Sequence, residues 1–296
     1  MIRSLFGNIA VRHATIAIGM AILALTPAFY VTALPQQTYP TIQKSLALVA
    51  YERTITQEGE RRVSRSFGTA FCISSTDEVS YFLTNEHVVR DADKVTLKSE
   101  YVAEFERESP ILSRPLAPGS LDGEVMQHSA DLDLAVIRVK WDRPLVPIPL
   151  GRLRDLSEYR KVDPIPHLRL TSHPPSIGTS VGIAGYPTIA TSGGVVNMIN
   201  LLTTSNPTAH FGQINGYIKD QVKGKSVDRY IEYDALTDNG NSGGPLFDAN
   251  TGVVYGIVDL VKFSRSEVNV KNNMAIPGAM AVEWLKANSV PFKLAD

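Results

Sequence analysis

The stretch that decides the fold reads Gly240-Asn241-Ser242-Gly243-Gly244-Pro245-Leu246. A serine flanked by glycines is typical of a tight turn that exposes a hydroxyl. Glycine also lets the neighbouring backbone N–H groups come close to a carbonyl without an intervening side chain. A Gly-rich hairpin without chemistry is the plain alternative. The stretch makes Ser242 a candidate nucleophile, which would need a base and an acid from elsewhere in the chain.

The positions of the histidines decide which kind of fold can use this serine. The stretch also fits Gly-x-Ser-x-Gly, which in α/β-hydrolases is followed along the chain by the acid and then by the histidine. All six histidines of this chain precede Ser242, and Pro245 is a poor start for the helix that such a turn requires. An esterase on that fold is therefore disfavoured, and the base must lie upstream.

His87 has the surroundings expected of a base. It follows the apolar run of residues 81–84, so the end of a strand would hold it rigidly. The remaining histidines lie in the N-terminal segment or in polar, loop-like surroundings, where a histidine is usually a surface residue: His13, His128, His167, His173 and His210.

The third group must orient the imidazole and stabilise its charged form. Asp133 opens the apolar run of residues 133–139, and an acid at the start of a buried strand can be shielded yet still reach a neighbour. Asp131 is the rival, because residues two apart share one face of a strand. Either aspartate could also be an ordinary strand-end or turn residue.

Short β-rich runs separated by glycine and proline follow Pro40 and indicate a sandwich or a barrel. One helix is expected near the end, at residues 279–287, and two polar segments look like insertions, at 99–120 and 151–175. The predicted strands are residues 45–51, 66–73, 81–84, 94–97, 134–139, 180–184, 195–202, 230–233 and 253–258.

Composition leaves the function to local sites. The 296 residues are 44% hydrophobic and 20% charged, and a net charge of −1 provides no field that would attract nucleic acid. The single cysteine, Cys72, lies in an apolar run, which indicates a buried small side chain and excludes an intramolecular disulfide. No metal-ligand spacing such as His-Glu-x-x-His is present, so we expect neither a metal nor a cofactor.

The N-terminal segment indicates an extracytoplasmic protein. Arg3, Arg12 and His13 precede an uncharged stretch whose residues 14–34 fit either a secretory signal or a membrane anchor, with a buried helix as a third interpretation. The basic flank would stay in the cytoplasm in the first two cases. We expect residues 1–39 to be the targeting or anchoring segment and residues 40–296 to be one folded body, periplasmic or secreted.

The order His, Asp, Ser and five motifs together resemble the catalytic domain of trypsin-like peptidases of the HtrA/Deg type. The motifs are similar, in chain order, to that family's Gly-Ser/Thr-Gly-Phe, Thr-Asn-x-His-Val-Val, Asp-Leu-Ala-Val, Gly-Asn-Ser-Gly-Gly-Pro-Leu and Phe-Ala-Ile-Pro. Here they read Phe67-Gly68-Thr69-Ala70-Phe71, Thr84-Asn85-Glu86-His87-Val88-Val89, Asp133-Leu134-Ala135-Val136, Gly240-Asn241-Ser242-Gly243-Gly244-Pro245-Leu246 and Asn273-Met274-Ala275-Ile276-Pro277.

This resemblance implies an all-β fold of two six-stranded antiparallel barrels, chymotrypsin-like, with the active site between them. It implies a serine endopeptidase that acts on polypeptides through an acyl-enzyme, with His87, Asp133 and Ser242 as its triad. The Leu-Ala-Val continuation selects Asp133 over Asp131, and the oxyanion donors would be the N–H groups of Gly240 and Ser242. A non-catalytic binding module on the same fold is the alternative, disfavoured because all three groups are present.

The chain departs from the family in two respects. HtrA proteins usually carry a PDZ domain after the peptidase, and we expect none here because few residues follow Pro277. Relatives of the glutamyl-endopeptidase type share a threonine at the place of Thr237, but they also have a histidine on the strand that here covers residues 253–259. We therefore expect no preference for glutamate.

The resemblance also predicts the walls of the substrate pocket. They are Leu236, Asp259, Leu260 and Val261. An uncharged leucine and a valine predict cleavage after small or medium apolar residues, since a buried charge without a partner is costly. Asp259 either turns toward the triad, which is the favoured interpretation, or faces the pocket and attracts Lys or Arg.

Overall fold

The computed structural model describes residues 38–57, 60–108, 117–140, 145–147, 159–187, 198–222, 225–259 and 273–295. The chain divides into two compact units, Met1–Leu34 and Pro35–Asp296, and every described residue belongs to the second. Within the described ranges no helix is both long and apolar enough to cross a bilayer. The expected signal or anchor at residues 14–34 lies outside these ranges.

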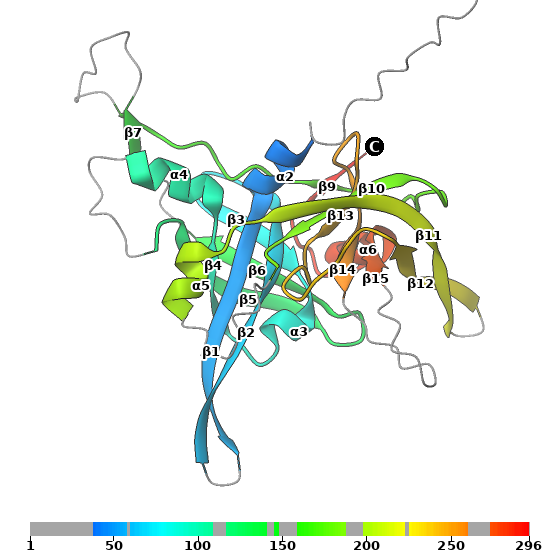
Figure 1. Ribbon diagram of the computed structural model, residues 1–296, viewed down its shortest axis with the longest axis horizontal. Coiled ribbons are helices and arrows are strands. Elements are labelled where there is room, and N and C mark those ends of the chain that lie inside the picture. The colour runs from blue at the N-terminus through cyan, green and yellow to red at the C-terminus, as the bar shows by residue number, and fades with distance from the viewer. Residues whose placement is uncertain are drawn as a thin grey trace, which may run out of the picture. The chain divides into compact units, whose positions relative to one another are not determined.

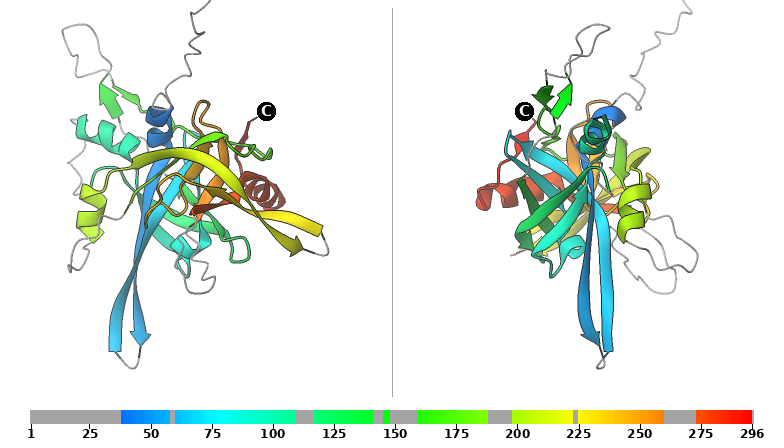
Figure 2. Two further views of the ribbon diagram at one scale, coloured as in Figure 1. Left: turned by 45° about the vertical axis from the view of Figure 1, so that its right-hand side comes forward. Right: turned by 90° about the vertical axis from the view of Figure 1, so that its left-hand side faces the viewer.

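Six antiparallel strands close the first barrel in the order β1-β2-β3-β6-β5-β4 (Figure 1). Figure 2 shows the hairpin of β1 and β2 extending well beyond the other strands of this barrel. The six strands are β1 (Leu46–Gln57), β2 (Glu60–Ser75), β3 (Val79–Thr84), β4 (Lys94–Lys98), β5 (Ser120–Ser129) and β6 (Leu134–Lys140).

Six further antiparallel strands form the second barrel in the order β13-β10-β11-β12-β15-β14, and the pairing of β13 with β14 closes it. The predicted fold of two six-stranded antiparallel barrels is therefore confirmed. The strands are β10 (Ser180–Gly185), β11 (Thr208–Val222), β12 (Lys225–Tyr233), β13 (Pro245–Asp248), β14 (Val254–Asp259) and β15 (Asn273–Pro277).

Short elements complete the described part of the chain. Strand β9 (Arg169–Leu170) adds to β14 in parallel and β16 (Lys293–Leu294) adds to β9, while β7 (Leu145–Pro147) and β8 (Tyr159–Lys161) pair only with each other. The helices are α2 (Tyr39–Ser45), α3 (Glu86–Val89), α4 (Glu100–Glu108), α5 (Met198–Thr204) and α6 (Gly278–Ala287). Helix α6 confirms the predicted C-terminal helix, and its Val282 and Leu285 are buried.

Two segments fold differently from their prediction. Residues 198–202 of the predicted strand 195–202 belong to helix α5, where the hydroxyls of Thr203 and Thr204 bond back to the carbonyl of Asn200. A short apolar run has no period that separates strand from helix. The polar insertion contains helix α4, which the i,i+4 aromatic pair Tyr101–Phe105 stabilises with its ring centroids 5.1 Å apart.

Alternation along the strands sorts the apolar side chains into three clusters. On β1, Ala47 and Val49 pack inside the first barrel, whereas Leu46 and Leu48 turn outward into a cluster shared with the second barrel. That shared cluster also includes Phe247 of β13, so apolar packing joins the two barrels. Separate clusters fill the barrel interiors.

Cys72 belongs to the interior of the first barrel and is fully buried. Burial raises the pKa of its thiol well above the ordinary value, and so disfavours the reactive thiolate. The prediction of a buried small side chain is confirmed.

Candidate active site

The loop before β13 holds Ser242 in a constrained turn. Gly240 and Gly243 have φ angles of 93° and 84°, in the left-handed region that favours glycine. A Cβ at Gly243 would collide with the carbonyl oxygen of Thr69 and the hydroxyl of Thr84. The glycines around Ser242 are therefore needed to bring this loop against the first barrel.

Thr69 on β2 holds the same loop by two hydrogen bonds. Its backbone N–H donates to the carbonyl of Ser242 at 2.8 Å, and its hydroxyl donates to the carbonyl of Gly240 at 2.7 Å. The hydroxyl oxygen also accepts a bond from the N–H of Tyr186 at 2.9 Å. Thr69 is fully buried, so these bonds are shielded from water.

His87 and Asp133 face each other across the first barrel's end. The carboxylate of Asp133 accepts two hydrogen bonds from His87, one from the backbone N–H at 2.8 Å and one from ring Nδ1 at 2.6 Å. Because Nδ1 carries the proton in this bond, Nε2 is the ring atom that can accept one. Asn85 also holds the backbone of Asp133 in place, since its side-chain amide donates to the Asp133 carbonyl at 3.0 Å.

His87 does not lie at the end of a strand, as the sequence predicted, but in the helix after that strand. It is the second residue of helix α3, a single turn that is separated from β3 by Asn85. Asp133 precedes β6 with a φ of 52°, a conformation that aspartate tolerates better than most side chains. At Asp131 it is the backbone carbonyl that makes a hydrogen bond, with the guanidinium of Arg229.

Asp259, at the end of β14, is directed toward this pair. It is 4% exposed. A ring nitrogen of His87, a carboxylate oxygen of Asp133 and a carboxylate oxygen of Asp259 all lie within 4.8 Å of one another. Of the other residues expected around the substrate, Leu236 is 60% exposed, and Leu260 and Val261 lie outside the described residues.

The cluster shifts the proton affinities of its members. Burial raises the pKa of Asp259 to about 6, with the charge of Asp133 acting in the same direction and His87 and Arg229 opposing it. Burial is also the largest influence on His87 and lowers its pKa. The hydrogen bond and charge of Asp133, together with the charge of Asp259, outweigh that effect, so that the pKa of His87 is raised overall.

A comparison with protein families decides the identity of the fold. The model of the trypsin-like peptidase domain matches residues 68–257. The chain belongs to the trypsin-like peptidase family. Its relatives include a probable periplasmic serine endoprotease, DegP-like, from Bartonella henselae, which is 27% identical over 225 residues. That match covers 76% of this peptidase chain but 34% of the relative, so the chain spans about a third of the relative's length.

Solved structures share the fold of this trypsin-like chain. A variant of the HtrA-type protease AlgW with a decapeptide superposes with a TM-score of 0.57 at 19% identity, covering 86% of this chain and 66% of that one. The active form of the Rv3671c protease from M. tuberculosis gives a TM-score of 0.55 at 19% identity and covers 90% and 89%.

The positioning of the serine loop by Thr69 is a feature of this chain that sequence reasoning missed. Thr69 was part of a quoted motif, Phe67-Gly68-Thr69-Ala70-Phe71, but nothing in the residues says which backbone groups its hydroxyl meets. Its partners, Gly240 and Tyr186, lie more than a hundred residues away. A buried threonine between two small residues was the available signal.

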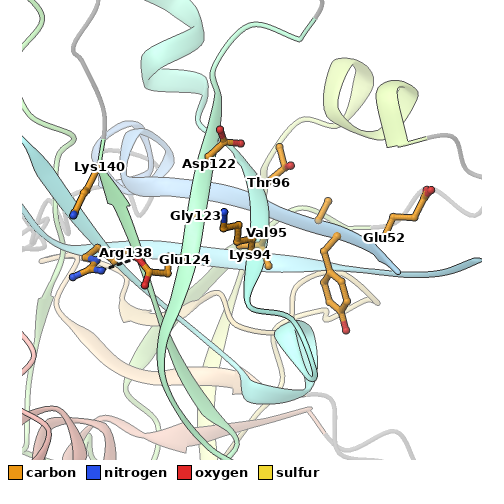
Figure 3. A pocket seen from close by; sticks show the side chains of 11 residues that line it. Glu52, Lys94, Val95, Thr96, Asp122, Gly123, Glu124, Arg138 and Lys140 are labelled. Atoms are coloured by element: carbon orange, nitrogen blue, oxygen red, sulfur yellow. Dashed lines mark hydrogen bonds and ion pairs between the residues drawn. The ribbon is translucent and has the colours of Figure 1, made fainter. Parts of the chain in front are cut away.

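A separate concavity of about 640 Å³ lies on the first barrel of the peptidase (Figure 3). Its charged side chains are of both signs, and Arg138 and Glu124 pair at 2.7 Å. His87, Asp133 and Ser242 are not among its lining residues, so it is distinct from the candidate active site. It is lined by Ala50, Tyr51, Glu52, Lys94, Val95, Thr96, Asp122, Gly123, Glu124, Arg138 and Lys140.

Proposed function

We propose that the protein is a serine endopeptidase whose triad is Ser242, His87 and Asp133. The observation that carries this proposal is the 2.6 Å bond between His87 Nδ1 and Asp133 Oδ2, made by two residues 46 positions apart in the chain. Membership of the trypsin-like peptidase family and the glycine-flanked turn at Ser242 support it.

Each group then has one task in peptide hydrolysis. The Oγ of Ser242 attacks the carbonyl carbon of the scissile bond while Nε2 of His87 takes the hydroxyl proton. The N–H groups of Gly240 and Ser242 hold the oxyanion that forms. His87 then gives the proton to the leaving amine, which departs and leaves an acyl group on Ser242.

The second half returns the enzyme to its starting state. Water attacks the acyl carbon, His87 accepts the water's proton, and the same proton returns to Oγ as the acid leaves. Asp133 accepts the Nδ1–H bond throughout, which keeps Nε2 available and stabilises the imidazolium. A protonated His87 cannot act as the base, so activity falls as the pH drops through its raised pKa.

The substrates are polypeptides cleaved after small or medium apolar residues. Leu236 offers no charge to a basic side chain, and Asp259 is buried beside His87 and Asp133, so its carboxylate is engaged there. The peptide-bound AlgW structure is consistent with a polypeptide substrate on this fold. A peptide library decides the preference, and dominant cleavage after Arg or Lys rejects an apolar pocket.

The protein acts outside the cytoplasm, in the periplasm or after secretion. The basic residues followed by the uncharged segment 14–34 support this, as does the periplasmic designation of the Bartonella henselae relative. Sequencing the N-terminus of the mature protein decides whether the segment is removed or kept as an anchor.

A fluorophosphonate probe tests the function directly. Such a probe reacts with an activated serine, so we expect one label, at Ser242, in the wild-type protein and none in Ser242→Ala. Folded wild-type protein that takes up no label, and cleaves no peptide, would instead be a binding module on the same fold. The exposed Ser180 is a matched control, because Ser180→Ala keeps the label.

A further inference from the structure

Asp259 is a second buried carboxylate that the proposed mechanism does not use. It lies at the end of β14, and one of its carboxylate oxygens is within 4.8 Å of a ring nitrogen of His87 and of a carboxylate oxygen of Asp133. Two carboxylates and an imidazole this close together interact electrostatically, so the protonation of each group affects the pKa of the others. The inference drawn from this arrangement rests on the proposed function of the site and adds a residue to it.

The groups that face Asp259 come from several elements. Helix α3 contributes His87, the turn before β6 contributes Asp133, and β12 contributes Arg229, Tyr230 and Tyr233. Across the sheet, β15 places the uncharged Met274 opposite Asp259. The charge of Arg90, also on the His87 side, opposes protonation of the imidazole.

These neighbours divide into two opposing sets. Burial and the charge of Asp133 keep a proton on Asp259, whereas the positive charges of His87 and Arg229 favour its ionised form. The balance places the pKa of Asp259 at about 6, close to neutrality, where a buried carboxylate can exchange its proton with solvent within the working range of an enzyme. In the ionised form its charge raises the pKa of His87.

We propose that Asp259 is a positioning residue that sets the proton affinity of His87. In mild acid it is a neutral carboxylic acid and adds no charge beside the imidazole. At neutral pH it has released that proton to solvent and adds a second negative charge beside the imidazole. The additional charge makes His87 a stronger base and stabilises the imidazolium that forms as Ser242 attacks.

A titration by NMR tests this without any catalysis. In the full chain carrying Ser242→Ala, the ring signals of His87, assigned with a His87→Gln variant, are followed from pH 4 to pH 9. Removing the charge with Asp259→Asn should lower the pKa of His87 by about 0.5 to 2.5 units, the range for charges near 5 Å at effective dielectric constants of about 80 to 20. Asp131→Asn, at the neighbouring aspartate, is the control and should leave it within about 0.3 units.

Two further measurements keep the test decisive if Asp259→Asn folds poorly. Asp259→Ser removes the same charge with a smaller side chain. The carboxyl carbon of Asp259 can also be titrated directly without substituting Asp259 itself, and its midpoint should lie near pH 6. A midpoint near the ordinary aspartate value of about 4, or a His87 pKa that both substitutions leave unchanged, overturns the proposal.

Kinetics separate charge from mere packing. If Asp259 acts through its charge, the ratio of kcat/KM for the wild type to that for Asp259→Asn should rise at least about threefold between pH 5 and pH 8, the factor that corresponds to a shift of about 0.5 pKa units. A purely structural role lowers kcat/KM by the same factor at every pH and contradicts the proposal. If the Asp259 substitutions shift the pKa of His87 but the protein cleaves no peptide, the peptidase function is rejected and the role of Asp259 is kept. If the protein cleaves peptides but the pKa of His87 does not shift, the peptidase function is kept and the role of Asp259 is rejected.

Discussion

The hydroxyl of Thr69 donates a 2.7 Å hydrogen bond to the carbonyl oxygen of Gly240, although 171 residues separate the two along the chain. Thr69 lies on β2 of the first barrel, and Gly240 belongs to the loop that presents Ser242 from the second. Gly240 is also a proposed oxyanion donor through its N–H. A single buried side chain therefore connects the packing of the barrels to the orientation of the serine loop.

Thr69→Val tests this connection with a side chain of nearly the same shape. The substitution leaves two buried backbone groups without their partner, the carbonyl of Gly240 and the N–H of Tyr186. We expect the free energy of unfolding to fall by about 2–4 kcal/mol and kcat to fall about 10- to 100-fold. Thr69→Ser keeps the hydroxyl and should retain most of both. Urea unfolding and peptide kinetics measure the two effects, and a Val variant with wild-type kcat would disprove the link.

Ser242→Ala should abolish peptide hydrolysis, with a loss of about 10⁴-fold or more in kcat. Ser242 is 6% exposed, and the loop is held through its backbone carbonyl, so loss of the hydroxyl should leave the fold in place. Circular dichroism and thermal unfolding provide the control for structure. Near wild-type activity in a clean preparation of this variant would reject the mechanism.

Asp133→Asn should slow turnover by about 10⁴-fold, because an amide that donates to Nδ1 leaves the imidazole in the wrong tautomer. The left-handed φ of 52° suits asparagine as well as aspartate, so backbone strain does not confuse the comparison. Asp131→Asn removes a similar charge two residues away and should cost less than about tenfold. If the two variants rank the other way, Asp131 is the acid. Stopped-flow or steady-state assays with one peptide suffice.

Asp259→Asn should make the folded protein more stable at neutral pH. The folded state raises the pKa of Asp259 from 3.8 to about 6, so this group favours folding most below 3.8 and loses that contribution as pH rises through 6. Asparagine resembles the protonated form at every pH. The variant should exceed the wild type by about 1–3 kcal/mol at pH 8, with the gain shrinking toward pH 4. Urea denaturation at both pH values checks the sign; a pH-independent difference would contradict it.

Truncation should show that residues before Pro40 belong to the folded body. The hydroxyl of Tyr39 donates to the carbonyl of Pro207 at 2.8 Å, and that of Thr38 donates to the carbonyl of Ala249 at 3.0 Å. A chain that starts at Pro35, the boundary of the compact unit, should be soluble and active. One that starts at Pro40 should lose about 1–3 kcal/mol of stability. If the chains that start at Pro35 and at Pro40 have equal unfolding midpoints, the folded body begins at residue 40.

The motifs carried enough information to predict the two barrels, but not every strand. Strands β5 and β11 were missed because glycines and β-bulges interrupt their alternation, as between Val125 and Gln127 and between Ile214 and Gly216. Glycine is required at such a position by residues that are distant in the sequence. A Cβ at Gly123 would collide with the side chains of Leu97 and Ile137. A local pattern contains no trace of such partners.

The candidate site was predictable as residue types and not as geometry. Strand alternation could not separate Asp133 from Asp131, because both precede β6 and the left-handed φ of Asp133 ends the alternation there. His87 was expected at the end of a strand and lies in a one-turn helix beyond it. The proximity of Asp259 followed only from family resemblance, since its carboxylate reaches the site through the closure of the second barrel.

The apolar cluster shared by the two barrels determines how the barrels can move relative to each other. Leu46 and Leu48 of the first barrel and Phe247 of the second are fully buried in one continuous core. Separating the two barrels would expose these apolar side chains to water, so we expect the barrels to move together rather than about a hinge. For the same reason, we expect a nick in the chain between the barrels to leave two fragments that stay associated.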